Sequence, residues 1–576
     1  MTRRRRPPLP LAGAVTALVL SAACHPQASN RAQAETAATL PDGPVVTGVT
    51  THFAQGWPPR LLPRAKALGA GMIRDSVHWP TVERTPGTYA FTPANSAHVD
   101  RACAAGLKVL LGLEPRNPLY DGGQTVWTPA GQAAFARYAR ALADRWPGCV
   151  TALEIGNEIN GKGGMIGPAA QNRIEAHVTL LRAVNAAVKP AHPALALLGG
   201  SSNAIPTGFL TRLFRAGALD LVDGIAVHPY RDQPEGVEHE LARLAAAMAA
   251  AGQVRPIWVT EFSRDFARPQ DAAPYYLKSR ALMEGAGVRY HLWYALADQP
   301  GFPTMGLLRF DGTEKPAGAA FRFAAQTLAP RGPARRIAHG DPALYHYAFG
   351  PDAHVVWGAP RTLLVRPGPS GPPRFFRADG TQVADPGTVS DDPLVITGAQ
   401  ALAFGPPQVL ADSTYGFAEP SLAWSARSGA SAPVPLGWVD WQWNSYLGSP
   451  RLPQAAVTPL AMAVAPGLFT LVRWTAKAPG TVYASACFAP RARLAGTVHL
   501  AVTSAGQTRW SADLAPARTT APAIAQVALA VKAGATVDLT VAGSAAGRIA
   551  YRWRIAVSPD APAPCPATPS QGNPAP

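Results

Sequence analysis

Two short apolar runs end in carboxylates that could work as a pair. The first run ends in Asn157-Glu158, and the second, Trp258–Phe262, carries Glu261. Hydrolysis of a glycosidic bond needs two such groups, because one carboxyl protonates the leaving oxygen while the other attacks the anomeric carbon or activates water. A separation of about 5–5.5 Å between the two carboxyls gives retention of configuration. The sequence therefore raises glycosidic chemistry as its first candidate.

Further polar and aromatic residues end neighbouring runs. Arg74 lies within Gly71–Val77, and a cation beside one glutamate would keep that carboxyl ionised, as a nucleophile requires. His228, which precedes Pro229-Tyr230, could belong to the site or could be only a structural histidine. Glu154 lies deeper on the same strand face as Glu158, and a single glutamate at a strand end is more often solvated or ion-paired than catalytic. No His, Asp and Glu spacing matches a metal site, so we predict neither a metal nor another cofactor.

The segment that must position these residues covers 43–328. Short β-rich runs alternate there with Ala- and Leu-rich helical stretches such as Ala130–Arg145, Ala169–Val188, Glu238–Ala251 and Pro274–Gly285. Eight such runs over this length predict a (β/α)8 barrel, whose active site lies at the C-terminal ends of its strands. A doubly wound sheet is the rival, but Gly48–His52 lacks a phosphate-binding glycine turn. The runs are Val45–Thr51, Gly71–Val77, Lys108–Leu113, Val150–Ile155, Ala194–Gly199, Gly224–Val227, Ile257–Thr260 and Val288–Trp293.

Two antiparallel β-sandwich-like domains are predicted after the barrel. Residues 329–408 contain short strands between Gly, Pro and Asp turns, and Asp379-Gly380 is a hairpin signal. Residues 409–558 alternate as in an accessory β-sandwich and hold seven of the 14 tryptophans. Trp438, Trp441, Trp443 and Tyr446 cluster in one segment and could form a sugar-binding platform. We favour the alternative that Trp441 and Trp443 face a sandwich core with Trp474 and Trp553. Residues 559–576 are Pro- and Ala-rich, which predicts a disordered tail.

The N-terminus resembles a secretory signal. Arg3–Arg6, the apolar stretch Leu9–Leu20 and the small residues before Cys24 predict a signal peptide over 1–24, followed by a linker over 25–42. We therefore expect a periplasmic or extracellular protein, and the sequence leaves open whether Cys24 carries a lipid anchor. An oxidising compartment permits the pairs Cys103–Cys149 and Cys487–Cys565, with unpaired buried thiols as the alternative.

The charge balance excludes one class of partner. Lys and Arg number 52 against 36 Asp and Glu, a net charge of +16, but no run of basic residues follows the signal. A thinly spread excess does not form a nucleic-acid-binding stripe, so no nucleic-acid partner is predicted. We expect a monomer, and a mild positive field favours an acidic polysaccharide or an anionic envelope surface.

The barrel segment resembles the clan A glycoside hydrolases. Asn157-Glu158 on the fourth strand and Thr260-Glu261 on the seventh match the positions of the clan's acid/base and nucleophile. Arg74–Trp79 with Pro86–Phe91 is similar to the clan's second-strand segment, and Gly306–Leu308 through Lys315–Ala317 is similar to the last loop and helix of family 39 and its exopolysaccharide-processing relatives. The resemblance covers about 45–328.

The resemblance implies a role for each matched residue. Glu158 would be the acid/base, Glu261 the nucleophile, and Asn157 would hydrogen-bond the sugar 2-hydroxyl. Arg74 would keep Glu261 ionised, and Tyr230 or His228 would orient that glutamate. Trp79 and Trp293 would stack on sugar faces, unless both serve only packing. Many relatives carry Pro and Asn after the acid/base, whereas this chain has Ile159-Asn160 and a Gly-rich loop.

Together these features predict an exported retaining glycoside hydrolase that cleaves β-linked bonds in a poly- or oligosaccharide, with bacterial exopolysaccharide as one candidate. Two alternatives remain open. A transglycosylase would use the same residues, and a non-catalytic polysaccharide-binding envelope protein would need neither carboxyl.

Overall fold

The computed structural model describes residues 43–369, 371–417, 421–440, 445–490, 495–515 and 522–566. The predicted signal peptide, the linker and Cys24 lie outside the described residues, as do Trp441 and Trp443. Among the helices that are described, none is both long and apolar enough to cross a membrane.

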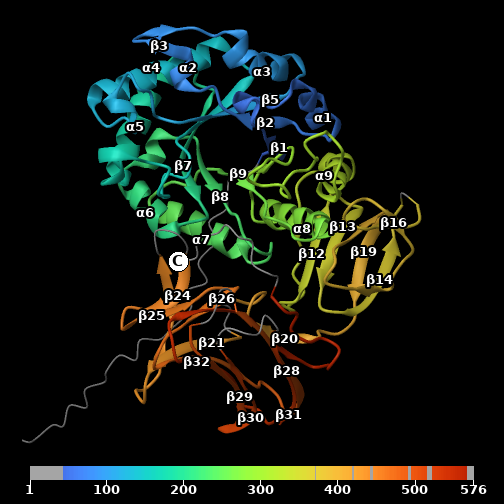
Figure 1. Ribbon diagram of the computed structural model, residues 1–576. Helices are drawn as coiled ribbons and strands as arrows, with labels where there is room; N and C mark the ends of the chain where they lie inside the picture. Colours follow the sequence, from blue (N-terminus) through green and yellow to red (C-terminus); the bar gives the residue numbers. More distant parts are fainter. Residues whose placement is uncertain are drawn as a thin grey trace, which may run out of the picture. The chain divides into compact units, whose positions relative to one another are not determined.

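A closed barrel of eight parallel strands occupies the N-terminal half (Figure 1). The barrel order is β1-β10-β9-β8-β7-β6-β5-β2, so each predicted run forms one stave and the (β/α)8 prediction is confirmed. The strands are β1 Val46–Thr50, β2 Met72–Asp75, β5 Lys108–Leu113, β6 Val150–Ile155, β7 Ala196–Asn203, β8 Gly224–His228, β9 Ile257–Phe262 and β10 Tyr290–Trp293.

Helices lie between consecutive strands and cover the outside of the barrel. Helix α4 (Pro129–Arg145) buries an apolar stripe, in which Phe135, Tyr138 and Leu142 recur at helical spacing. A two-stranded hairpin, β3 Glu83–Thr85 and β4 Thr88–Tyr89, interrupts the connection from β2 to β5. The helices are α1 Leu62–Ala67, α2 Trp79–Val82, α3 Pro93–Ala104, α4 Pro129–Arg145, α5 Arg173–Val188, α6 Thr207–Arg215, α7 Val237–Ala250, α8 Ala272–Gly285 and α9 Pro316–Thr327.

Strand alternation divides the barrel interior into layers. An apolar cluster fills the lower interior: Met72, Leu110, Ala152, Leu198, Ala226, Trp258 and Leu292. Since side chains of one strand face the same side every second residue, the next inward positions are Arg74, Glu154, His228 and Thr260. A polar layer therefore rests directly on the apolar one, at the C-terminal end where the predicted site lies.

The small β-domain follows the barrel. Its six-stranded sheet runs β11-β12-β13-β18-β15-β16 and a three-stranded sheet runs β17-β14-β19. Asp379-Gly380 forms the predicted turn between β15 and β16, with Gly380 at φ +87°. Gly398, at φ +75°, divides the predicted strand 394–404 in two. The strands are β11 Arg335–Arg336, β12 Leu344–Phe349, β13 Ala353–Gly358, β14 Arg361–Pro367, β15 Arg374–Phe376, β16 Gln382–Val383, β17 Thr388–Val389, β18 Leu394–Thr397 and β19 Ala399–Phe404.

A second β-module forms two antiparallel sheets around its own core. Trp474 and Trp553 are buried in that core, as predicted, whereas Trp438 is partly buried beneath the guanidinium of Arg243. One sheet holds β20 Val409–Asp412, β23 Gly437–Asp440, β24 Ser445–Ser449, β25 Leu452–Val457, β26 Ala461–Val464, β28 Gly480–Pro490, β31 Ala523–Val531 and β33 Gly547–Ala556. The other holds β21 Ala423–Ser428, β22 Val434–Pro435, β27 Leu468–Thr475, β29 Val498–Ser504, β30 Gln507–Leu514 and β32 Thr536–Gly543.

The prediction of a disordered tail is wrong for 559–566. Cys565 forms a disulfide with Cys487 of β28, and the amide of Ala563 donates a 2.7 Å hydrogen bond to Ser485. These bonds hold the segment against the sandwich, so its Pro-rich composition does not decide its order. Cys103 and Cys149 form the other predicted disulfide, with Cα atoms 5.6 Å apart.

Candidate active site

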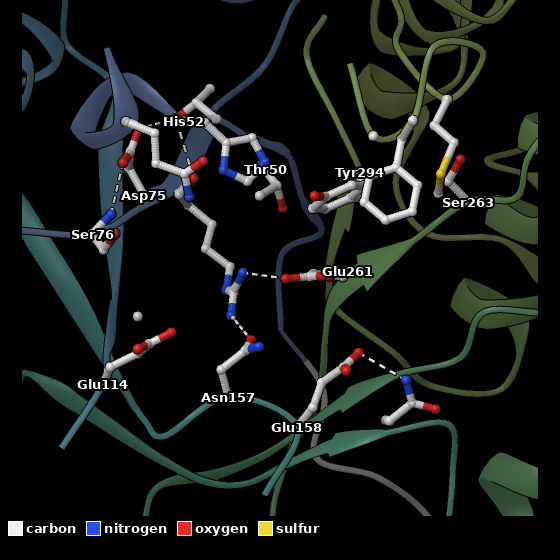
Figure 2. Close-up of a pocket in the computed structure, with 18 of the residues that line it drawn as sticks. Thr50, His52, Asp75, Ser76, Glu114, Asn157, Glu158, Glu261, Ser263 and Tyr294 are labelled. Carbon is white, nitrogen blue, oxygen red and sulfur yellow. Dashed lines mark hydrogen bonds and ion pairs between the residues drawn. The ribbon is translucent and has the colours of Figure 1, made fainter. Parts of the chain in front are cut away.

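A cavity of about 700 Å³ opens at the C-terminal ends of the barrel strands. Its lining comes from the C-terminal ends of most barrel strands and from the loops that follow them. Figure 2 shows Glu158 and Glu261 beside the same space, with Asn157 near Glu158. The structure thus brings both predicted carboxyls to one cavity, although they are separated by 103 positions in the chain.

The two glutamates are close and differ in exposure. One carboxylate oxygen of Glu158, one of Glu261 and a ring nitrogen of His228 all lie within 4.8 Å of one another. The side chain of Glu158 is 31% exposed, whereas that of Glu261 is 9% exposed. Glu158 can therefore exchange a proton with solvent, while Glu261 is enclosed by fixed partners.

Arg74 crosses the floor of the cavity and contacts three of the site's side chains. Its guanidinium donates to Glu261 through Nη1, to Glu154 Oε2 at 2.6 Å through Nε, and to Asn157 Oδ1 at 2.9 Å through Nη2. Burial opposes its charge, yet Glu154 and Glu261 raise the pKa of Arg74 above its usual value. The arginine thus supplies a permanent positive charge beside Glu261 and leaves the amide nitrogen of Asn157 for a substrate.

His228 faces hydrogen-bond acceptors on both sides of its ring. Nε2 lies 3.0 Å from Thr260 Oγ1 and 3.3 Å from Glu154 Oε1, and Nδ1 lies 3.4 Å from Glu158 Oε1. Thr260 donates its own hydroxyl hydrogen to Glu154, so it can only accept from the imidazole. Both ring nitrogens must then be donors. Burial opposes this charge, but Glu261, Glu154 and Glu158 raise the pKa of His228 to about 10.

Glu154 lies at the most deeply buried end of this hydrogen-bond network. It is fully buried and accepts from Arg74, His228 and Thr260. Although burial favours its neutral form, Arg74 and His228 lower the pKa of Glu154 to about 2. Of the two states expected for Glu154, solvated or ion-paired, the structure contains the ion-paired one, with Arg74 and His228 as the partners.

Tyr230 orients the buried glutamate. Its hydroxyl donates to Glu261 Oε2, while Arg74 donates to Oε1 of the same carboxylate. Burial and the charge of Glu261 raise the pKa of Tyr230 well above its usual value, so the phenol remains a donor. His228 Nδ1 lies 3.7 Å from Glu261, farther than from Glu158. Of the two residues predicted to orient Glu261, Tyr230 makes the hydrogen bond.

The backbone at Glu158 adopts a conformation that non-glycine residues avoid. Its φ is +46°, which typically costs about 1–2 kcal/mol. The amide of Gly161 donates to its carbonyl at 2.7 Å, and Gly164 packs so closely that an added Cβ would lie 2.0 Å from the same oxygen. The Gly-rich loop that departs from the clan pattern is thus the support that holds Glu158 in place.

Asn203 fixes the side chain of Glu158. Its Nδ2 donates a 2.9 Å hydrogen bond to Glu158 Oε1. The side-chain amide of Asn160 holds the backbone of Asn203, because its Oδ1 accepts from the Asn203 amide and its Nδ2 donates to the Asn203 carbonyl. Burial favours the neutral acid, but His228 and Asn203 lower the pKa of Glu158 below its usual value. The surroundings of Glu158 therefore favour its ionised form.

Neither predicted tryptophan offers a face to the cavity. Trp293 is fully buried, donates to the carbonyl of Met305 and packs against Phe262, because alternation directs Leu292 inward and Trp293 outward. Trp79 reaches the lining but is 2% exposed; its ring packs nearly parallel to those of Tyr120 and Tyr138, and it donates to Glu83. Both residues are packing residues, and their predicted stacking role is corrected.

Two residues that line the cavity, Tyr294 and Asn203, were not predicted from the sequence. Tyr294, the residue after Trp293, lines the cavity and makes edge contacts with His52 and Tyr230. Asn203 lies four residues beyond the predicted end of its strand, since β7 continues to it. The signal that could have located it is the polar sequence Ser201-Ser202-Asn203 at the end of an apolar run.

The geometry also permits a test for a metal. Among the described residues, Glu158, His228 and Glu261 form one group whose ligand atoms are close enough to hold an ion. A histidine ligates a metal through a neutral ring nitrogen, whereas both nitrogens of His228 face acceptors. Arg74 and Tyr230 already donate to Glu261. The residues therefore do not fit a metal site.

Comparisons with known proteins identify the fold. No family model matches the sequence, and no curated protein matches it. A family 39 glycoside hydrolase from Bacteroides cellulosilyticus WH2 superposes with a TM-score of 0.52 at 20% identity, covering 62% of this chain and 83% of that one. The chain shares the fold of that enzyme. This agrees with the fold that the resemblance to clan A implied.

Two other family 39 structures superpose with lower scores. A β-xylosidase from Caulobacter crescentus has a TM-score of 0.45 at 14% identity, with 63% of this chain and 97% of that chain covered. An enzyme from Xanthomonas axonopodis pv. citri has a TM-score of 0.44 at 14% identity, with 88% and 96% covered.

Proposed function

We propose that the protein is a retaining glycoside hydrolase acting on a poly- or oligosaccharide. The observation that carries this proposal is the approach of carboxylate oxygens of Glu158 and Glu261 to within 4.8 Å across an open cavity. That spacing suits direct attack by one carboxylate, because an inverting pair stands about 6.5–9.5 Å apart to admit a water molecule.

In the first step, a carboxylate oxygen of Glu261 bonds to the anomeric carbon as the glycosidic C–O bond breaks. Glu158 donates its proton to the leaving oxygen, so the released sugar departs as a neutral alcohol. Arg74 and Tyr230 donate hydrogen bonds to the two carboxylate oxygens of Glu261 and so orient it before attack. Asn157, fixed by Arg74, presents its amide nitrogen for the sugar 2-hydroxyl.

In the second step, Glu158 removes a proton from water. The hydroxide oxygen bonds to the anomeric carbon, the bond to Glu261 breaks, and both carboxyls return to their starting states. Because Glu158 is ionised in the free site, the first step needs a protonated fraction of it. Substrate that fills the cavity displaces water from Glu158 and so favours the acid form.

Substitution of each glutamate tests the assignment. Glu261→Gln should abolish release of reducing ends from the glycan. Glu158→Ala should lose activity on natural linkages but recover part of it with azide on substrates that carry good leaving groups. Proton NMR of the first product should show the substrate's anomer. Inversion of that anomer, or full activity of Glu261→Gln, would exclude double displacement at this pair.

Analysis of the reaction products separates hydrolysis from the two alternatives, transglycosylation and binding without catalysis. Longer products in the presence of an acceptor sugar would indicate transglycosylation by the same residues. Binding without any release of reducing ends would indicate a binding protein.

We also propose that the enzyme is exported, since two disulfides are typical of oxidising compartments. A fusion of residues 1–24 to a reporter tests export, and cytoplasmic retention of that reporter would refute it.

A further inference from the structure

Arg264 differs from the other arginines that line the cavity. Arg74 pairs with Glu154 and Glu261, Arg116 pairs with Glu114 at 2.9 Å, and Arg231 pairs with Glu240 at 3.2 Å. For Arg264, no carboxylate in the part of the chain that the structure describes lies within ion-pair distance. A guanidinium that is partly removed from water without a counter-charge is unfavourable unless a ligand supplies the charge.

The guanidinium of Arg264 is nevertheless held in place. Nε donates to the carbonyl of Asp265 at 3.1 Å, Nη1 donates to the carbonyl of Asp232, and the group lies 5.4 Å from the ring centre of Phe266. The carboxylate of Asp265 is engaged elsewhere, by the hydroxyl of Thr304. These contacts fix the side chain through backbone carbonyls, without an ion pair to a carboxylate of the described residues.

Arg264 also lies close to the reacting groups in the chain. It follows Glu261 by three residues, so their Cα atoms are at most about 11 Å apart, and Ser263 and Asp265 on either side of it line the same cavity. A sugar whose anomeric carbon meets Glu261, or the next sugar along, can therefore reach the arginine.

We infer that Arg264 binds an oxyanion substituent of the glycan and makes this a site for acidic sugars. Arginine suits this task because its planar fork binds a carboxylate or a sulfate through paired hydrogen bonds. The inference rests on the proposed function for the position of the sugar but not on the occurrence of hydrolysis. It names the substrate class: glycans that carry uronate carboxylates or sulfate esters.

Matched pairs of glycans test the inference. Binding is measured by isothermal titration on a Glu261→Gln parent, so that hydrolysis does not interfere. The probes are hyaluronan and alginate, each against its carboxyl-reduced form, and κ-carrageenan against its desulfated form. Arg264→Gln and Arg264→Lys are compared with the parent. Arg268→Gln is the control, because Arg268 is exposed and pairs with Asp271 outside the cavity lining.

We expect the parent to prefer at least one charged glycan over its neutral partner. Arg264→Gln should weaken that charged glycan by about tenfold or more while changing the neutral partner by less than about twofold. Arg264→Lys should give an intermediate loss, because it keeps the charge without the fork. Dependence confined to carrageenan would assign the oxyanion as a sulfate, and dependence on the other pairs would assign it as a carboxylate.

Three results would overturn the inference: equal binding of charged and neutral partners, equal weakening of both by Arg264→Gln, or no binding of any probe. If Arg264 governs binding but the protein with Glu261 intact releases no reducing ends, the proposed hydrolysis fails while the recognition of acidic glycans stands.

Discussion

His228 Nδ1 lies 3.4 Å from Glu158 Oε1, and the opposite nitrogen of the same ring faces Glu154. One imidazole thus connects the solvent-reachable carboxyl of the site to its most buried one. Because both nitrogens meet acceptors, the ring must carry two hydrogens, and its positive charge opposes protonation of Glu158. The acid form of Glu158 is therefore scarce before substrate binds, which gives the site a characteristic pH dependence.

The first prediction concerns Asn203→Ala. Only protonated Glu158 can donate to the leaving group, so kcat/KM should fall as pH rises above the pKa of Glu158 in the free enzyme. Loss of the Asn203 hydrogen bond removes a contact that favours the ionised form. The alkaline limb of the pH profile should move upward by roughly one pH unit, since such bonds contribute about 1.5 kcal/mol or more. An unmoved limb would contradict the role of Asn203.

The second prediction concerns Glu154→Gln. The amide can offer its nitrogen to His228 Nε2, which would then become an acceptor and leave the ring neutral. Nitrogen-15 NMR of labelled histidine should show His228 doubly protonated at pH 7 in the wild type and neutral in the variant. The His228→Gln spectrum assigns the signal. A neutral wild-type ring would refute the assignment of the imidazolium.

The third prediction uses neighbouring glycines. Gly164→Ala would place a Cβ 2.0 Å from the Glu158 carbonyl, whereas a Cβ at Gly163 meets nothing within 4 Å. Displacement of a catalytic group by about 1 Å can cost roughly 100-fold, so Gly164→Ala should lower kcat by at least about tenfold. Gly163→Ala is the matched control and should retain kcat. Similar kcat values for the two variants would show that the loop does not position Glu158.

The fourth prediction concerns a chain of three histidines in the small β-domain. His339 Nε2 lies 2.9 Å from His346 Nδ1, and His346 Nε2 lies 2.9 Å from His354 Nδ1. Burial and the neighbouring histidines lower the pKa of His346 to about 3. The unfolded state, with a pKa near 6.5, then binds more protons between these values, so stability should fall as pH drops below about 6.5.

Calorimetry at pH 7 and pH 4.5 checks this effect. His346→Gln should be less stable at pH 7, since a buried hydrogen bond is altered, but should lose about 2 kcal/mol less than the wild type on acidification. His499→Gln is the control, because His499 is exposed in the other β-module. Equal acid losses in wild type and His346→Gln would contradict the prediction.

The sequence allowed the barrel and the meeting of Glu158 and Glu261 at one cavity to be predicted, because both depend on local pattern. Apolar runs at regular spacing define strands, and a residue at the C-terminal end of a barrel strand is expected at the end of the barrel that holds the site. The direction of one side chain does not follow from such patterns. Trp293 and Tyr294 are adjacent, and only the alternation set by Leu292 decides that the tyrosine, not the tryptophan, reaches the cavity.

The partners that residues contact over long sequence distances could not be predicted from the sequence. Asn203 contacts Glu158 across 45 positions, and Glu154 contacts Arg74 across 80. The order of 559–566 depends on a disulfide to β28, 78 positions away, while its composition alone indicates disorder. In each case the partner, not the residue type, decides the role.

The bond between Cys487 and Cys565 has a mechanical consequence. It closes a covalent ring that contains β29, β30, β31, β32 and β33, so these strands lie inside a loop that tension cannot open. A pull applied beyond Cys565 passes through sulfur to β28 and leaves β33 unloaded. The pulled end therefore loads β28, which is hydrogen-bonded to β33 on one side and to β31, the last strand in the sheet order, on the other.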